Sequence, residues 1–359
     1  VDIATNIEPK ELIRLLNKEK IQYFETGIDH GTITVLIDNL KFEITTLRKD
    51  LDTDGRHANV EFVSSWELDA KRRDFTINAI YVNTAGEIYD PLNGIKDLKN
   101  GKVCFIGDPN LRIKEDYLRI LRYIRFFTQY SKYDHEKEVI KAIKVNIGNS
   151  VKLSKERLLL ELYKILELKN FEKIFQNKFT CFIILSLFPQ LKNYNRLINV
   201  KTVSNEVLSK INKDLILATL LIDETDDSEY FIYKYNLSNV SKKTIMFIKK
   251  NYKNYSLKSF LDKNFLLKLC YLNSKELVIS LLIFQIFNTP RKTKKIESMV
   301  KYINDVEIPK FPIKAYYLKN QFNFTDGKVL GDALKKLENI WIDNNFKLEK
   351  IEIESILKI

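Results

Sequence analysis

The sequence is poor in cysteine, in long apolar runs and in sorting signals. Three cysteines occur among 359 residues (Cys104, Cys181 and Cys270) without any Cys-x-x-Cys pair. This scarcity argues against a disulfide framework and a zinc site. The longest apolar runs, such as Cys181–Leu185, are far shorter than the roughly 20 residues of a membrane span. No basic segment followed by an apolar one opens the chain, so no secretory signal is visible. We therefore expect a cytoplasmic protein without a membrane segment, whose cysteines fill the core.

Composition and charge are those of a folded protein with a polyanionic partner. Hydrophobic residues make up 45% of the chain and charged residues 30%, which is typical of globular proteins and not of disordered ones. A chain of this length exceeds one ordinary core, so two or more domains are expected. The formal net charge of +12 favours binding to a polyanion.

Arginine is scarce and unevenly placed. Only 12 of the 59 basic residues are arginines, and nine of these lie between Arg48 and Arg157. Lysine serves wherever a point charge is enough, so clustered arginines in a lysine-rich chain favour bidentate contacts to phosphate, carboxylate or base edges. Chance clustering of surface arginines is the alternative. The pattern predicts that the chemistry lies in the first half of the chain.

Helices and a short sheet are predicted for the first hundred residues. Pro9 fits the first turn of a helix. The β-rich runs 32–37 and 41–47 flank Asp38-Asn39 and predict a hairpin. The other predictions here are a polar loop over 49–59, a helix over 69–80, and short strands over 80–83 and 87–89. This mixture is typical of an α/β or α+β fold.

The rest of the chain is predicted to be helical. Glycine is absent between Gly148 and Gly327, and apolar residues recur at helical spacing. The helical segments are 112–127, 136–146, 154–168, much of 203–288, and 330–344 after a basic break at 289–295.

Two carboxylates near the start are the first candidates for catalysis. Asp2 is predicted to end a strand, and Glu43 lies within the strand Phe42-Glu43-Ile44. Burying an unpaired carboxylate is costly, and a bound divalent cation removes that cost. Carboxylates on adjacent strands are the usual arrangement for two-metal phosphoryl transfer. The alternative is that Glu43 faces solvent on the polar side of an alternating strand.

A basic segment supplies the second set of candidates. Residues 71–79 combine Arg72, Arg73, Asp74 and Asn78, which offer guanidinium groups for a triphosphate and an amide for a ribose hydroxyl. A solvated basic turn, in which Asp74 caps a helix, explains the pattern equally well.

The third set is Asp116 and Arg119. Their i, i+3 spacing places both side chains on one side of the predicted helix over 112–127. The Watson–Crick edges of cytosine and adenine each present an amino donor beside a ring-nitrogen acceptor. A carboxylate and a guanidinium match that pattern, whereas guanine and uracil present the opposite one. An intrahelical salt bridge on a solvated face is the alternative.

Several motifs in order make the sequence similar to a known family. It resembles the class II nucleotidyltransferases, the family of bacterial CCA-adding enzymes and bacterial poly(A) polymerases. The tail around 308–312 and 331–341 resembles the CCA-adding branch, although Ala315-Tyr316-Tyr317 replaces the expected Gly-x-Asp-Leu. The motifs that carry the resemblance are Asp2-Ile3-Ala4-Thr5, Gly31-Thr32-Ile33-Thr34-Val35, 42–48, 72–79, Asp90-Pro91-Leu92-Asn93-Gly94, 112–119 and Leu153-Ser154-Lys155-Glu156-Arg157.

The resemblance implies an α+β architecture with an all-helical second part. Residues 1–109 correspond to a nucleotidyltransferase head of the polymerase-β-like superfamily, with a small mixed sheet. Residues 110–169 correspond to a helical neck that carries the base-reading helix, 170–290 to a helical body, and 291–359 to a helical tail that binds RNA.

The resemblance also implies roles for individual residues. Asp2 and Glu43 correspond to ligands of two Mg²⁺ ions. The base-reading pair is Asp116 and Arg119, and Arg122 lies one turn further along the same pocket. The Asp54-Gly55-Arg56 region corresponds to a flexible loop associated with switching from CTP to ATP. The family's segment that binds the sugar and phosphates of the incoming nucleotide corresponds to Arg72, Arg73, Asp74 and Asn78.

The implied activity is the addition of C, C and A to the 3′ end of tRNA from CTP and ATP, with no obligatory protein partner. The alternatives are a poly(A) polymerase or a CC- or A-adding enzyme on the same scaffold. The family's Gly-Gly turn and its first metal-binding aspartate precede the segment that corresponds to Val1. We therefore expect a polypeptide of this sequence alone to be N-terminally truncated and nearly inactive, or a non-catalytic RNA-binding remnant.

Overall fold

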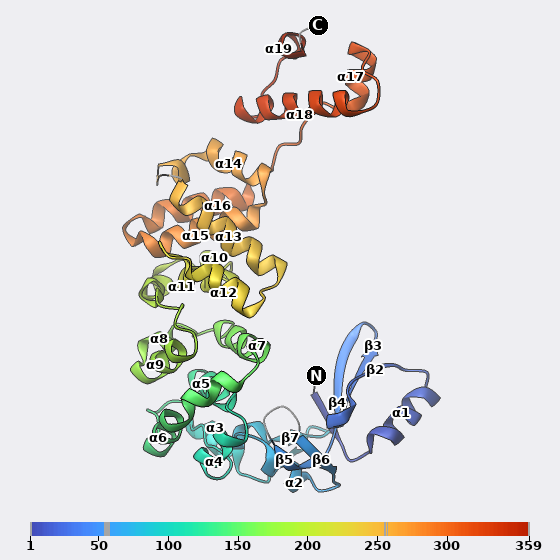
Figure 1. Cartoon of the computed structure of the whole chain (residues 1–359), viewed down its shortest axis with the longest axis vertical. Coiled ribbons are helices and arrows are strands. Elements are labelled where there is room, and N and C mark those ends of the chain that lie inside the picture. Colours follow the sequence, from blue (N-terminus) through green and yellow to red (C-terminus); the bar gives the residue numbers. More distant parts are fainter. Residues whose placement is uncertain (1, 54–57, 255, 257, 358–359) are drawn as a thin grey trace. The chain divides into compact units, whose positions relative to one another are not determined.

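The computed structural model describes residues 2–53, 58–254, 256 and 258–357. The chain divides into two compact units, Val1–Pro189 and Gln190–Ile359. In Figure 1 the first unit runs from blue to green and the second from green to red.

A four-stranded mixed sheet opens the first unit. The strand order is β1-β4-β3-β2, and β1 is parallel to β4 whereas the other neighbours are antiparallel. The predicted mixed sheet is therefore confirmed. The strands are β1 (Asp2–Thr5), β2 (Gln22–Gly27), β3 (Thr32–Ile37) and β4 (Leu40–Thr46).

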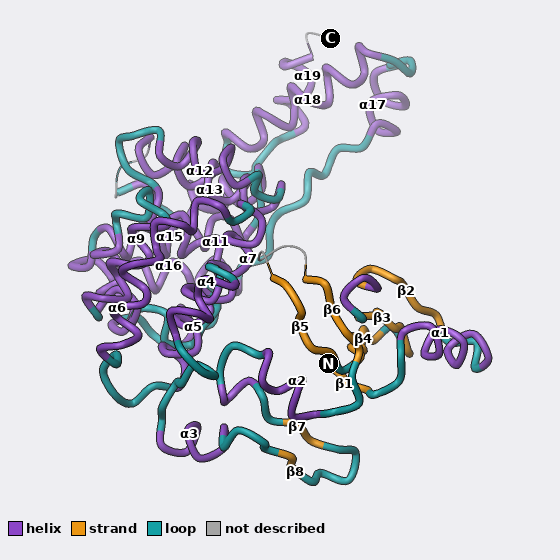
Figure 2. Tube along the Cα trace, turned by 60° about the horizontal axis from the view of Figure 1, so that its bottom comes forward, coloured by secondary structure: helices purple, strands orange, loops and turns teal. Residues whose placement is uncertain are grey.

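Alternation along β3 and β4 gives this sheet one apolar and one polar face. Helix α1 (Pro9–Lys18) begins at the predicted proline and packs Leu12 and Leu16 against Ile33 and Val35. Figure 2 shows α1 beside these strands. The predicted hairpin is also confirmed, because Asp38 and Asn39 adopt φ values of 49° and 63°, as a two-residue turn with positive φ at both positions requires. Helix α1 therefore covers the apolar face of the sheet and not the polar one.

The predicted polar loop over 49–59 is wrong for its described part. Strands β5 (Arg48–Thr53) and β6 (Ala58–Phe62) form an antiparallel pair, seen as two adjacent orange tubes in Figure 2. The inward residues Arg48 and Asp50 line a polar pocket, so the segment lacks the apolar alternation that normally reveals a strand. The Asp54-Gly55-Arg56 segment lies outside the described residues.

The predicted helix over 69–80 is shorter and begins earlier. Helix α2 (Trp66–Arg72) starts after Ser65, whose hydroxyl accepts from the Leu68 amide at 3.4 Å. The chain then leaves the helix, and the fully buried Phe75 forms an isolated antiparallel backbone bridge with Phe105. The ring centres of Phe75 and Phe105 lie 4.7 Å apart. A 3₁₀ turn (Thr76–Asn78) and the short strands β7 (Tyr81–Val82) and β8 (Ile88–Tyr89) follow.

The predicted single helix over 112–127 is two helices. Helix α4 (Pro109–Glu115) ends before Asp116, which is extended with φ −152° and ψ 107°, and helix α5 (Arg119–Tyr130) follows. The Leu118 amide donates to Asp116 Oδ1 at 3.1 Å, so the side chain of Asp116 forms an Asx turn just before the second helix. Ile120, Leu121 and Ile124 of α5 are fully buried, in agreement with the predicted helical spacing of apolar residues over 112–127.

The first unit is completed by helices that follow the predicted all-helical pattern. They are α3 (Gly94–Asn100), α6 (Lys137–Asn146), a 3₁₀ segment (Ile147–Lys152), α7 (Lys155–Leu166), α8 (Lys173–Gln176) and α9 (Lys178–Leu187).

The described residues of the second unit form helices joined by loops, without a strand. Helix α15 is buried on every side from Leu277 to Phe287, which marks it as the centre of the packing. The predicted final segment 330–344 corresponds to α18, whose Leu330 and Leu337 pack against Leu318 of α17 and Ile353 of α19. The helices are α10 (Asn205–Leu208), α11 (Lys213–Leu221), α12 (Asp227–Tyr235), α13 (Asn239–Asn254), α14 (Lys263–Leu272), α15 (Lys275–Asn288), α16 (Thr293–Asp305), α17 (Ala315–Phe322), α18 (Lys328–Asp343) and α19 (Lys350–Leu357), with 3₁₀ segments at Tyr194–Thr202, Ser259–Leu261 and Pro290–Lys292.

None of the helices in the described residues combines the length and the apolar character needed to cross a membrane. Two of the three cysteines, Cys181 and Cys270, are buried, as predicted for core-filling thiols.

Candidate active site

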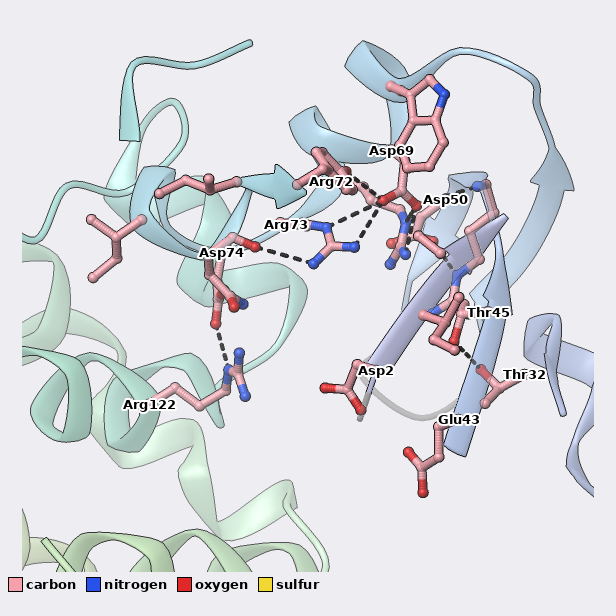
Figure 3. Close-up of a pocket in the computed structure, with 18 of the residues that line it drawn as sticks. Asp2, Thr32, Glu43, Thr45, Asp50, Asp69, Arg72, Arg73, Asp74 and Arg122 are labelled. Carbon is pink, nitrogen blue, oxygen red and sulfur yellow. Dashed lines mark hydrogen bonds and ion pairs between the residues drawn. The ribbon is translucent and has the colours of Figure 1, made fainter. Parts of the chain in front are cut away.

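A single pocket in the first unit collects the polar residues that the sequence singled out. It has a volume of about 940 Å³ and lies between the polar face of the first sheet and the segments around α2 and α5. All nine predicted site residues line it, although they come from four separate stretches of chain: Asp2, Glu43, Arg72, Arg73, Asp74, Asn78, Asp116, Arg119 and Arg122. Figure 3 shows six of them around the cavity.

The two predicted metal ligands lie side by side on adjacent strands. Asp2 and Glu43 are register partners in the parallel pair β1–β4, so their side chains leave the sheet on the same face. Figure 3 shows both carboxylates at the same edge of the pocket. Glu43 does stand on the polar side of an alternating strand, but that side faces the pocket. Lys41 Nζ lies 2.7 Å from Glu43 Oε1.

These carboxylates suit a hard divalent cation, which prefers oxygen ligands. Their shared register offers two such groups at one point of the sheet. No group of three or more His, Cys, Asp or Glu side chains placed to hold a metal occurs within residues 2–53, 58–254, 256 and 258–357. Asp2 and Glu43 therefore stand as a pair of carboxylates, with no third such ligand placed beside them among the described residues.

Arg72 and Arg73 converge on the buried carboxylate of Asp69, as Figure 3 shows. Burial on its own raises the pKa of Asp69, but Arg72, the Tyr81 hydroxyl and Arg73 outweigh it and hold that pKa below its ordinary value. Burial, together with the hydrogen bond to Asp69, raises the pKa of Tyr81. Asp69 is therefore ionised and the two arginines are oriented together.

Asp74 connects the α2 segment to α5. Its carboxylate is 4% exposed and accepts from Arg122 Nε, from Asn78 Nδ2 at 2.9 Å and from the Phe75 amide at 3.1 Å. Burial opposes ionisation, yet Arg122 and Asn78 keep the pKa of Asp74 below its usual range. Burial would also lower the pKa of Arg122, and Asp74 raises it. The pair fixes one wall of the pocket.

Asp116 and Arg119 line the same pocket, but not through the helical spacing that predicted their meeting. Asp116 lies in the break between α4 and α5, and its Oδ2 accepts from Arg157 Nη2 at 2.7 Å. Arg119 Nη1 donates to Glu115 Oε2 at 2.5 Å and to the Arg112 carbonyl at 2.9 Å. The intrahelical Asp116–Arg119 salt bridge considered above is therefore absent among the described contacts. Each residue has a separate partner.

Several lining residues escaped the sequence analysis. Asp69 precedes Arg72 and Arg73 by three and four positions, and this helical spacing would have revealed it. Arg48 and Asp50 belong to the strand β5, whose polar residues from Lys49 onward predict a loop. Arg157 lies 41 residues from Asp116, so no local pattern links the two.

Comparisons with known proteins agree with this geometry. The model of the poly A polymerase head domain matches residues 1–104. The zebrafish (Danio rerio) protein "CCA tRNA nucleotidyltransferase 1, mitochondrial" is 31% identical over 99% of this chain and 82% of its own length. The chain belongs to the class II tRNA nucleotidyltransferase family. The CCA-adding enzyme of Ligilactobacillus salivarius is 29% identical over 100% of this chain and 88% of its own length.

Solved structures of class II tRNA nucleotidyltransferases share the fold. The Bacillus stearothermophilus CCA-adding enzyme in complex with CTP has a TM-score of 0.64 at 20% identity, covering 100% of this chain and 87% of that one. The Thermotoga maritima CCA-adding enzyme complexed with tRNA has a TM-score of 0.60 at 22% identity, covering 100% and 86%. The α+β class, with a mixed-sheet head followed by helices, is thus confirmed. Class II tRNA nucleotidyltransferases are generally metal-dependent enzymes.

Proposed function

We propose that this protein adds C, C and A to the 3′ ends of tRNA from CTP and ATP. The observation that carries the proposal is the convergence of all nine predicted residues on one pocket, in a chain that matches CCA-adding enzymes over nearly its whole length. The alternative poly(A)-adding and partial activities become outcomes of the test below.

Arg72 and Arg73 bind the triphosphate of the incoming nucleotide. Both guanidinium groups line the pocket, with side chains 16% and 28% exposed. They are therefore partly desolvated, which strengthens their attraction for phosphate. Asp74 and Asn78 form the adjoining wall and bind the ribose. Arg122 neutralises the charge of Asp74. A negatively charged group of the nucleotide can therefore lie beside Asp74 without leaving a net negative charge buried.

Asp116 and Arg119 select the base. A carboxylate oxygen accepts from the amino group of cytosine or adenine, and a guanidinium N–H donates to the ring nitrogen beside it. Asp116 keeps capacity for this bond, because its two oxygens provide about four acceptor sites and two donors occupy them here, the Leu118 amide and Arg157. Uracil and guanine leave the buried donors and acceptors unpaired and are rejected.

Asp2 and Glu43 hold the divalent cations, for which Mg²⁺ is the proposed ion. When bound, such ions supply activation of the primer hydroxyl and neutralisation of charge on the phosphates. The protein's own contribution is to bring two carboxylates to one register position on adjacent strands. Lys41 balances part of the charge on Glu43.

We also propose that residues 1–109 act as head, 110–169 as neck, 170–290 as body and 291–359 as tail, with the tail binding tRNA. The net charge of +12 supports a contact with the RNA backbone. A cytoplasmic location stays a prediction, since some relatives are named as mitochondrial.

A primer-extension assay tests the function. The full-length protein is incubated with tRNA lacking its CCA end, together with Mg²⁺ and CTP alone, ATP alone, or both, and product lengths are read on a gel. Two additions from CTP, a third only with ATP, and a halt establish CCA addition. A ladder from ATP alone indicates a poly(A) polymerase, two additions and nothing further a CC-adding enzyme, and no extension an RNA-binding protein. A chelator in place of Mg²⁺ is the control.

A further inference from the structure

The carboxylate of Asp69 accepts hydrogen bonds from more residues than any other carboxylate described above. It is 1% exposed. Arg72 donates from Nε to Oδ1 at 2.8 Å, and its Nη2 lies 2.7 Å from the same oxygen. Arg73 donates from Nε and Nη2 to Oδ2 at 3.2 and 3.1 Å. The Arg48 amide and the Tyr81 hydroxyl complete the set, at 3.3 and 2.7 Å.

Each arginine thus meets a different oxygen of Asp69 through two of its nitrogens. Such two-point contacts fix the plane of a guanidinium as well as its position. Tyr81 adds a second constraint on Arg73, whose guanidinium carbon lies 5.0 Å from the centre of the Tyr81 ring. That ring is itself held by the edge of Trp66, with 5.0 Å between the ring centres.

The backbone of the arginine pair is held independently of Asp69. Arg112 Nη2 donates to the carbonyls of both Arg72 and Arg73. Arg112 comes from α4, whereas Asp69 comes from α2. Arg73 Nη1 also donates to the Asn78 carbonyl at 3.1 Å. Removing the charge of Asp69 therefore releases the guanidinium of Arg72 and loosens that of Arg73, while their backbone stays in place.

We propose that Asp69 is the positioning residue that aims Arg72 and Arg73 at the phosphates of the incoming nucleotide, with Tyr81 as its support. This inference rests on the proposed function. Asp69 does not touch the base-selecting residues, since Asp116 is held by Arg157 and Arg119 by Glu115. CTP and ATP share the triphosphate, so loss of Asp69 weakens both equally and leaves base selection intact.

The main variant is Asp69→Asn, which keeps the shape of the side chain but removes its charge and one of its two acceptor oxygens. Groups that orient the ligands of a metal ion typically change its affinity about 10- to 100-fold when they are lost, and we expect a comparable effect for a group that orients two arginines. We expect KM for CTP and for ATP to rise by one common factor in this range. Preference for CTP over UTP remains within about twofold of the parent protein. Pyrophosphate, which carries the phosphates without a base, should lose affinity by a similar factor in a direct binding assay.

Two further variants keep the test interpretable. Tyr81→Phe removes only the hydroxyl that reaches Asp69, and a smaller common rise of about two- to fivefold is expected. Glu161→Gln is the matched control. Glu161 is a carboxylate of similar burial that pairs with Arg125, an arginine outside the pocket. This control lowers the melting temperature without weakening pyrophosphate binding.

Equal pyrophosphate affinity in folded Asp69→Asn and parent protein would overturn the inference. So would a rise in KM confined to one nucleotide, or lost preference for CTP over UTP. If Asp69→Asn fails to fold, an unchanged KM in Tyr81→Phe contradicts it instead. The binding arm needs no turnover, so absence of CCA addition by the parent protein refutes the proposed function while pyrophosphate affinity still decides the role of Asp69.

Discussion

Replacing Asp74 by asparagine should destabilise the first unit, because Asp74 forms a buried ion pair with Arg122. Removing one partner of a buried ion pair costs about 3–5 kcal/mol, because the other charge is left uncompensated. Arg122 has a side chain 25% exposed, so water compensates part of this loss and we expect about 2–3 kcal/mol. For a unit of this size that corresponds to a fall in melting temperature of about 4–12 °C.

The effect should depend on pH in a defined direction. The pKa of Asp74 in the folded protein lies below its ordinary value, so the ionised group stabilises the fold above the unfolded pKa of about 3.9. This contribution is lost as the pH falls through the folded pKa. The difference in unfolding free energy between parent and Asp74→Asn should therefore be constant from about pH 5 to 8 and shrink below about pH 4.

Thermal and denaturant unfolding, followed by circular dichroism, measures both predictions. A double-mutant cycle with Arg122→Gln isolates the pair, and a coupling energy above about 1 kcal/mol is expected. The reasoning is refuted if the cycle shows no coupling at pH 7, or if the full difference persists below the native pKa of Asp74.

Three further predictions concern selection, RNA binding and packing. Asp116→Ala should lower the preference for CTP over UTP about 10- to 100-fold, since one hydrogen bond to a charged group is lost, while triphosphate binding changes little; equal discrimination in competition assays would contradict the base-selecting role. Removing the exposed cations Lys310 and Lys314 together should reduce the slope of log K for tRNA against log salt by about 0.7–0.9 per lost phosphate contact, and an unchanged slope would place the RNA contact elsewhere. Gly94→Ala should lower the melting temperature, because a Cβ there would lie 2.2 Å from the Thr76 carbonyl oxygen; unaltered stability in a thermal scan would show that the 3₁₀ turn can move aside.

Local sequence patterns predicted an element correctly where a single periodicity or turn signal was present. The alternation around Asp38-Asn39 predicted the hairpin, and the proline at position 9 predicted the start of α1. Prediction failed where the pocket interrupts a pattern. The strand β5 presents Arg48 and Asp50 to the cavity, so it reads as a polar loop. The local spacing predicts a helix that continues past Arg72, but α2 ends there and Phe75 is buried in the core instead.

The family, the α+β class and nine of the residues that line the pocket could be predicted from the sequence, because these depend on residue types in a fixed order along the chain. Which charges meet depends on the tertiary structure. It pairs Asp116 with Arg157 and Arg119 with Glu115, and it places Asp69 under both Arg72 and Arg73. The strength of an ion pair depends on distance and burial in space. Contacts between segments 40 or more residues apart, such as Arg122 with Asp74, leave no periodic signal in the sequence.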